Sequence, residues 1–272
     1  MHSDLQPTHR QSVLAPELVD TVIDFLYNDR KVLNVCSLVC KTWVSAARYH
    51  LFGTIILHPS NIRSFHALRA SPHVTITPFI RRLSITDLEK VVNVSQEGKP
   101  ELDGTDDIKE SFSNLSNFVE CLKLDNFSWK LEHCQRQEAF IACFPSITRL
   151  ILSDASFDTF TNVLRTICSF PLLQELSICN VSWSSAPEDH MLSHFISPPP
   201  PLNRLALEIC YRRDILDVLL TLKPTSGVEI LQLGLVAPED AHTVARYLRA
   251  LGPSLKHLEF GFGGMDSGGD AG

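Results

Sequence analysis

Two pairs of side chains in this 272-residue sequence have the four-residue spacing that metal ligands use on a helix. His190 and His194 would lie on one face of a helix, as two zinc-binding histidines do. The residues between them are Met, Leu and Ser, so the glutamate that serves as general base in a zinc protease is missing. No third ligand is indicated. We therefore interpret these histidines as surface or packing residues.

Cys36 and Cys40 form the second pair, and they fall inside an apolar helical pattern, so we interpret both as core residues. The eight cysteines are scattered along the chain without a Cys-x-x-Cys pair. Several of them, including Cys121 and Cys179, occupy apolar positions of helical or strand patterns. This distribution indicates buried free thiols in a reducing compartment. We expect no metal and no cofactor.

The sequence gives no argument for catalysis. It contains no G-x-S-x-G, no P-loop, and no G-x-G-x-x-G between a strand and a helix. The glycines at 261, 263 and 264 precede no helical pattern. Asp106 and Asp107 lie in a polar stretch that suits solvation better than acid–base chemistry. We expect a protein that is not an enzyme.

The clearest pattern of structural elements lies between residues 14 and 57. Pro16 suits the first turn of a helix, and Glu17 and Asp20 would lie near its positive end. Helical spacing with one apolar face is found at Leu18, Val19, Val22, Ile23 and Leu26. After a break at Asn28-Asp29, further helical residues run from 32 to 47. Three short helices in about 40 residues have a thin core, so we expect a partner or a neighbouring domain to cover them.

This stretch resembles an F-box. The residues that carry the resemblance are Leu14-Ala15-Pro16-Glu17-Leu18, Ile23, Leu26, Cys36-Ser37-Leu38-Val39-Cys40-Lys41 and Trp43. The following Tyr49-His50-Leu51-Phe52 and Thr54-Ile55-Ile56-Leu57 are similar to F-box-like proteins of mushroom-type fungi. Ala15 departs from the family pattern, in which this position is usually proline.

The resemblance implies a docking unit. F-box proteins bind a Skp1-like adaptor and, through it, a cullin in an SCF-type ubiquitin ligase. Carried over by position, the adaptor-binding residues would be Leu14, Pro16, Glu17, Leu18, Ile23, Leu26, Leu38, Val39 and Trp43. The alternative is that Ile23, Leu26 and Trp43 are only the core of a small helical cap, since apolar stripes of this period usually pack on something.

A second pattern returns from residue 79 onwards. An apolar-x-apolar segment recurs with its first apolar residue at positions 83, 122, 150, 176, 205, 231 and 258. The first step is 39 residues and the later steps are 26 to 29, which is the signature of a repeat architecture. Each segment would place alternate side chains on one face of a short strand. Helical runs between the strands are predicted over 157–170, 188–196, 213–222 and 239–251.

These segments resemble leucine-rich repeats of the long, irregular kind. Prolines close several helices just before the next strand, as in Phe170-Pro171 and Gly252-Pro253. The asparagine ladder of that family is incomplete, because Asn126 and Asn180 lie near the ladder position while Asp154 does not. The expected build is a curved solenoid with a parallel sheet inside and helices outside. Its concave face is the first candidate for target contact, and the residues expected to project there or into neighbouring positions are Ser84, Lys123, Ile151, Ser177, Ala206, Gln232 and Glu259. The alternative is that these residues only solvate the sheet.

The predicted fold class is thus α/β, with a three-helix F-box-like unit followed by a leucine-rich-repeat-like solenoid. The predicted parts are a loose tail at 1–12, the helical domain at 13–50, the solenoid at 51–263 and a second tail at 264–272. The solenoid would begin with a strand at 52–57 and a helix at 62–69. An acidic segment at 97–110 would be an exposed, mobile loop within it, and the alternative is a loop that contacts a partner.

Composition limits the partners. The net charge of −7 and the absence of a basic block argue against nucleic acid. No apolar run is long enough for a membrane span, and the first residues lack the apolar stretch of a signal peptide. We expect a cytoplasmic or nuclear protein that is monomeric when free. The leading hypothesis is a substrate receptor that binds the adaptor and an unknown target protein. The alternative is an interaction scaffold with a degenerate F-box, outside any ligase.

Overall fold

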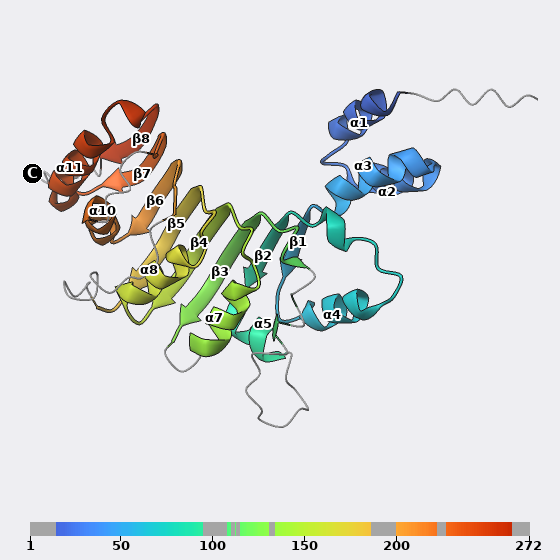
Figure 1. Ribbon diagram of the computed structural model, residues 1–272, viewed down its shortest axis with the longest axis horizontal. Coiled ribbons are helices and arrows are strands. Elements are labelled where there is room, and N and C mark those ends of the chain that lie inside the picture. Colours follow the sequence, from blue (N-terminus) through green and yellow to red (C-terminus); the bar gives the residue numbers. More distant parts are fainter. Residues whose placement is uncertain are drawn as a thin grey trace, which may run out of the picture. The chain divides into compact units, whose positions relative to one another are not determined.

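The computed structural model describes residues 15–94, 108–109, 112, 115–130, 134–185, 200–221 and 227–262. The chain divides into two compact units, the first ending at Thr54 and the second beginning at Ile55 (Figure 1). Among the described residues, no helix combines the length and the apolar character that crossing a membrane requires. The predicted tails at 1–12 and 264–272 lie outside the described residues.

The first unit, which we call the head, consists of three helices: α1 (Pro16–Phe25), α2 (Arg30–Val39) and α3 (Lys41–Phe52). Asp29 caps α2, because its Oδ1 accepts hydrogen bonds from the backbone N–H groups of Lys31 and Val32, each at 3.0 Å. Cys40 has an extended backbone with φ −162°, so α2 ends there and α3 starts in a new direction.

The core of the head is small and closed. It consists of Val19, Ile23, Leu33, Cys36, Ala47 and Leu51, with Leu26, Trp43, Ala46 and Phe52 packed against it. Two polar contacts tie the helices together: Arg30 Nη2 donates to the Leu51 carbonyl at 3.1 Å, and His50 Nε2 lies 2.8 Å from Asp24 Oδ1. The prediction that a strand begins at Phe52 was wrong, because Phe52 ends α3 and packs on this core.

The second unit, which we call the repeat unit, is built on one eight-stranded sheet. Its strands are β1 (Thr54–Leu57), β2 (Arg82–Thr86), β3 (Cys121–Trp129), β4 (Arg149–Phe157), β5 (Glu175–Trp183), β6 (Arg204–Cys210), β7 (Ile230–Val236) and β8 (His257–Phe262). They are ordered as in the sequence, and β2 to β8 pair in parallel. Since each strand neighbours the next one along the chain, the unit is an α/β solenoid.

The register of the sheet aligns the recurring leucines. Leu83, Leu122, Leu150, Leu176, Leu205, Leu231 and Leu258 are successive partners across β2 to β8. The first six of these side chains are buried, and so is the second apolar residue of each segment in the same strands. This confirms the predicted alignment of the repeats. The buried rows form a single core that runs the length of the repeat unit.

Helices cover one side of this sheet (Figure 1). They are α4 (Ile62–Ala70), α5 (Leu88–Val94), α7 (Cys134–Ala142), α8 (Phe160–Cys168), α10 (Arg212–Thr221) and α11 (Ala241–Leu251), with short 3-10 turns at Thr77–Phe79, Pro238–Asp240 and Gly252–Ser254. The helices predicted at 157–170, 213–222 and 239–251 correspond to α8, α10 and α11. The helix predicted at 188–196 lies outside the described residues, and α5 and α7 were not predicted.

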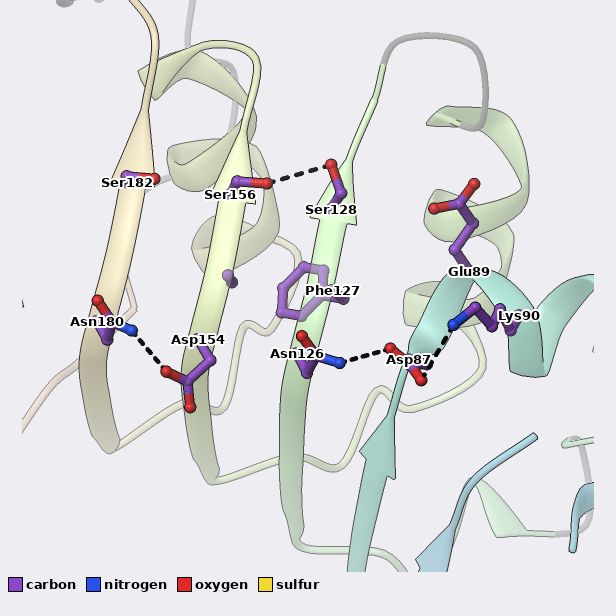
Figure 2. A pocket seen from close by; sticks show the side chains of 11 residues that line it. Asp87, Glu89, Lys90, Asn126, Phe127, Ser128, Asp154, Ser156, Asn180 and Ser182 are labelled. Carbon is purple, nitrogen blue, oxygen red and sulfur yellow. Dashed lines mark hydrogen bonds and ion pairs between the residues drawn. The ribbon is translucent and has the colours of Figure 1, made fainter. Parts of the chain in front are cut away.

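A column of residues with left-handed backbone crosses the sheet at equivalent positions of five successive strands. Its members, which we call the left-handed column, are Asp87, Asn126, Asp154, Asn180 and Ile209, with φ between 49° and 55°. Asn126 Nδ2 donates to Asp87 Oδ1 at 2.7 Å, and Asn180 Nδ2 donates to Asp154 Oδ1 at 2.6 Å (Figure 2). Asn and Asp tolerate this conformation better than other side chains do.

The left-handed column corrects two expectations. Asp154 does occupy the ladder position, since the register places it between Asn126 and Asn180. The strands are also longer than the four-residue motif suggested, and β3, β4 and β5 each have nine residues. They continue because the residue after each left-handed one is buried again; Phe127 and Ala155 are examples.

The predicted acidic loop at 97–110 falls mostly outside the described residues. Within that segment the structure describes Ile108 and Lys109, which are helical. Ile108 is buried in the core of the repeat unit, together with the nearby Phe112 and Leu115. The far end of the segment therefore contributes to packing.

Candidate functional site

Helix α1 carries two apolar stripes rather than the single face that its sequence predicts. Val19 and Ile23 point into the head core. Leu18, Val22 and Phe25 follow the same helical spacing one position earlier, and all three are exposed, with Phe25 84% accessible. The helix thus buries one stripe within the head and leaves the other uncovered.

Helix α2 repeats this arrangement. Leu33 and Cys36 are buried in the head core. Val35, Leu38 and Val39 are exposed on the same helix, and Leu38 is 85% accessible. Together with α1 this defines a set of uncovered large apolar side chains, which we call the apolar surface of the head: Leu18, Val22, Phe25, Tyr27, Val32, Val35, Leu38, Val39 and Tyr49.

The turn between α1 and α2 adds a shallow hollow of about 470 Å³. It is lined by residues 25–31, so its wall includes exposed Phe25 and Tyr27 as well as the cap residue Asp29. The basic residues Arg30 and Lys31 also line it. A partner with a protruding apolar side chain and an acidic neighbour would match this hollow.

The residues predicted to bind the adaptor fall into three groups. Leu18, Leu38, Val39 and Glu17 are exposed. Ile23 is fully buried, and Leu26 and Trp43 pack against the head core. These three residues therefore contribute to the core rather than to the apolar surface of the head. Pro16 is the first residue of α1, and Leu14 lies outside the described residues.

The apolar surface of the head also includes residues that the F-box resemblance did not identify. Val22, Phe25 and Val35 are exposed beside the predicted residues. Their signal was present in the sequence as apolar residues at i, i+4 and i+7, or i and i+3, next to the residues of the core stripe. This periodicity was missed because, in the sequence, two adjacent apolar stripes on one short helix cannot be told apart from one broad apolar face.

The exposed side of the sheet in the repeat unit has a different character. The seven strand-centre residues predicted for it lie half-exposed or exposed, except Ala206, which is buried. Polar groups there pair across strands: Arg149 Nη2 lies 2.7 Å from Glu175 Oε1, and Arg204 Nη2 donates to Gln232 Oε1 at 3.0 Å. Gln232 Nε2 in turn donates to Glu259 Oε2 at 2.6 Å. A ligand on these strand centres would therefore compete with contacts already made.

Cysteine environments vary more than the sequence suggested. Cys36 is buried, but Cys40 is exposed, so its assignment to the core was wrong; a hydrogen bond with Thr42 lowers the pKa of its thiol. Burial raises the pKa of Cys143 to about 11 and that of Cys210 to about 12. Cys121 and Cys179, which were also predicted to be buried, are only half-buried.

Among the residues that the structure describes, no three His, Cys, Asp or Glu side chains lie close enough together to hold a metal ion. The pair His190 and His194 lies outside the described residues.

Comparison with models of known protein families gives no match, and comparison with curated proteins gives none either.

Proposed function

We propose that this protein is a substrate-receptor subunit of an SCF-type ubiquitin ligase. The head would bind a Skp1-like adaptor through its apolar surface, and the repeat unit would bind a target protein. The chain would carry out no chemistry itself. It would act by holding the target near a conjugating enzyme, which turns an encounter between two proteins into a reaction within one assembly.

The observation that supports the proposal most strongly is the apolar surface of the head. Nine large apolar side chains of the head are exposed, whereas its buried core consists of six residues, two of which, Cys36 and Ala47, are small. So many exposed large apolar side chains on so small a unit favour a protein interaction site, because soluble proteins rarely leave large apolar areas uncovered. The surface also coincides with F-box-like residues, since Leu18, Leu38 and Val39 belong to both.

The test is co-purification with a Skp1-type adaptor, using Leu38→Lys as the main variant. Leu38 is the best choice because its side chain is outside the core, and a lysine near the C-terminal end of α2 is compatible with the helix dipole. Burying a leucine side chain contributes about 1.5–3 kcal/mol. We therefore expect the dissociation constant to rise by about tenfold to a hundredfold.

Leu172→Lys is the matched control, because Leu172 is an exposed leucine on the repeat unit. It should bind the adaptor as the unchanged chain does. Substitution of Leu26 or Trp43 would be less informative, since both pack against the head core. Failure of the unchanged, folded chain to bind the adaptor would refute the ligase proposal and favour an interaction scaffold with a degenerate F-box.

A further inference from the structure

A hollow of about 590 Å³ lies beside the polar part of the left-handed column (Figure 2). Asn126, Asp154 and Asn180 line it on three successive strands, and Asp87 continues the row at β2. A second row of small hydroxyls runs parallel to the first: Ser128, Ser156 and Ser182 are partners in the register. Glu89 and Lys90 of α5 form the wall at one end.

A second hollow of about 590 Å³ lies next to the first, over β5 and β6. Its distinctive members are Ile209 and Tyr211, which are 72% and 57% accessible. The Tyr211 ring is supported from the side by Trp183, with ring centroids 5.2 Å apart. The Trp183 indole N–H donates to Asp214 Oδ2 at 2.8 Å, so the supporting ring is itself held in place.

The two hollows adjoin, since Asn180 and Ser182 line both, and we treat them together as one groove. One end is polar, with amides, hydroxyls and carboxylates. The other end presents the large side chains of Ile209 and Tyr211 beside charged residues, and we call it the apolar end. We call the two hollows together the column groove.

The formal charges that line the column groove have a clear balance. At the polar end, Asp87, Glu89 and Asp154 outnumber Lys90. At the apolar end, the acidic members Asp214, Glu239 and Asp240 outnumber Arg212 and Arg213. Both ends are thus net negative, and charge complementarity favours a positively charged occupant.

We propose that the column groove binds an extended, basic peptide segment of a target protein, with one large apolar side chain seated on Ile209 and Tyr211. Basic side chains of the segment would reach Asp154 and Asp87. Asp154 already accepts a bond from Asn180, and Asp87 accepts one from Asn126 and lies 3.5 Å from Lys90 Nζ. A carboxylate has further acceptor positions for a lysine or arginine. Side-chain amides of the left-handed column and hydroxyls of the parallel serine row would bond the peptide backbone.

The strand spacing sets the pattern of the peptide. Neighbouring strands are about 4.8 Å apart, and an extended chain rises about 3.4 Å per residue. Asp154 is two strands away from Ile209 and Asp87 is four strands away. A segment that crosses the strands should therefore carry basic residues about three and about six positions from its apolar residue.

This inference rests on the proposed function, because it specifies the kind of target segment that the repeat unit would bind. Adaptor binding is measured in a separate experiment. The experiment uses fluorescence anisotropy with the full chain and labelled glycine–serine peptides that contain one leucine and two arginines at this spacing, in both orders. Peptides with the arginines replaced by glutamates, or placed next to the leucine, are the comparison. We expect the spaced basic peptide to bind at least about tenfold more tightly than either comparison peptide, and less tightly as salt is raised.

Two variants locate the binding. Ile209→Asn should weaken the spaced peptide by about tenfold, because it removes the apolar anchor. The same change should raise the melting temperature by about 2–4 °C, because asparagine replaces a β-branched residue in left-handed backbone. Weaker binding by a more stable protein cannot be explained by unfolding.

Asp154→Asn should weaken binding by about threefold while keeping an acceptor for Asn180. Its matched control is Glu138→Gln, a carboxylate on α7 that faces Arg165 and lies outside the groove.

Equal binding of acidic and basic peptides, or peptide binding unchanged by Ile209→Asn, would overturn the proposal. So would self-association of the chain that the peptide does not displace, since a second copy would then be the occupant. Leu38→Lys, which should weaken adaptor binding by about tenfold to a hundredfold, is expected to bind the peptide normally. A chain that loses one activity and keeps the other therefore shows which of the two proposals has failed.

Discussion

His66 is a half-buried residue of α4 whose environment favours its neutral form. Its ring meets Phe112 edge-on, with centroids 5.7 Å apart, and its buried Nε2 has no hydrogen-bond partner among the described residues. Burial, and next the positive charge of Arg69, lower the pKa of His66. The unfolded chain therefore takes up a proton at a higher pH than the folded one does.

The sign of the pH dependence follows from this difference. Above the unfolded-state histidine pKa of about 6.5, His66 is neutral in both states and does not reduce the free energy of unfolding. As the pH falls below that value, the free energy of unfolding decreases, because the unfolded chain binds the proton more readily than the folded chain. Urea unfolding of the chain at pH 7.5 and 5.5 should show this loss, and His66→Gln should reduce it. An unchanged difference between the two pH values in the variant would show that other groups cause it.

At the scale of the strand, the left-handed column alternates hydrogen-bond donors and acceptors. An amide meets a carboxylate both at Asn126 with Asp87 and at Asn180 with Asp154. Any side chain other than Asn, Asp or Gly costs about 1–2 kcal/mol in this backbone conformation. A further net contribution of about 1 kcal/mol comes from each hydrogen bond.

Asn126→Ala should therefore lower the free energy of unfolding by about 2 kcal/mol. Asn126→Gly should cost less, because glycine accepts the backbone conformation even though the hydrogen bond is lost. Asn126→Asp should also destabilise, since it places a second carboxylate next to Asp87. Chemical denaturation of the three variants gives this order directly. If Ala and Gly cost the same, the backbone conformation is not the source of the effect.

Sequence periodicity located the strands well because one leucine recurs in each repeat. The same steps also connect Asn126, Asp154, Asn180 and Ile209, which are 28, 26 and 29 residues apart. That spacing could have revealed the left-handed column, but the mixture of amide, carboxylate and isoleucine concealed it. Helix α7 was missed because its segment, CQRQEAFIA, has a weak apolar period.

The surface of the head could be predicted only in part. On α1 the apolar positions formed one broad face in the sequence, and only the packing of α3 decides which of them are covered. Residues such as Leu18 and Leu38 were identified through the resemblance, whereas Phe25 required the structure. Pairing across the exposed side of the sheet, as between Arg149 and Glu175, also depends on the register and was not predictable from local pattern.

At the scale of the whole molecule, the chain divides its surfaces between two units. The head has a small core and a large uncovered apolar surface. The repeat unit has a long continuous core, and polar side chains pair across strands on its open side, within the column groove as well as outside it. This division fits a protein that holds one common partner and one variable partner.

The most direct test of the account is amide hydrogen exchange of the full chain with and without a Skp1-type adaptor. A bound partner slows exchange where it covers or stabilises the backbone. We expect slower exchange within residues 15–52 and no change across β2 to β8. Slower exchange in the strands of the repeat unit, or no change in α1 and α2 at saturating adaptor, would contradict the proposed role of the head.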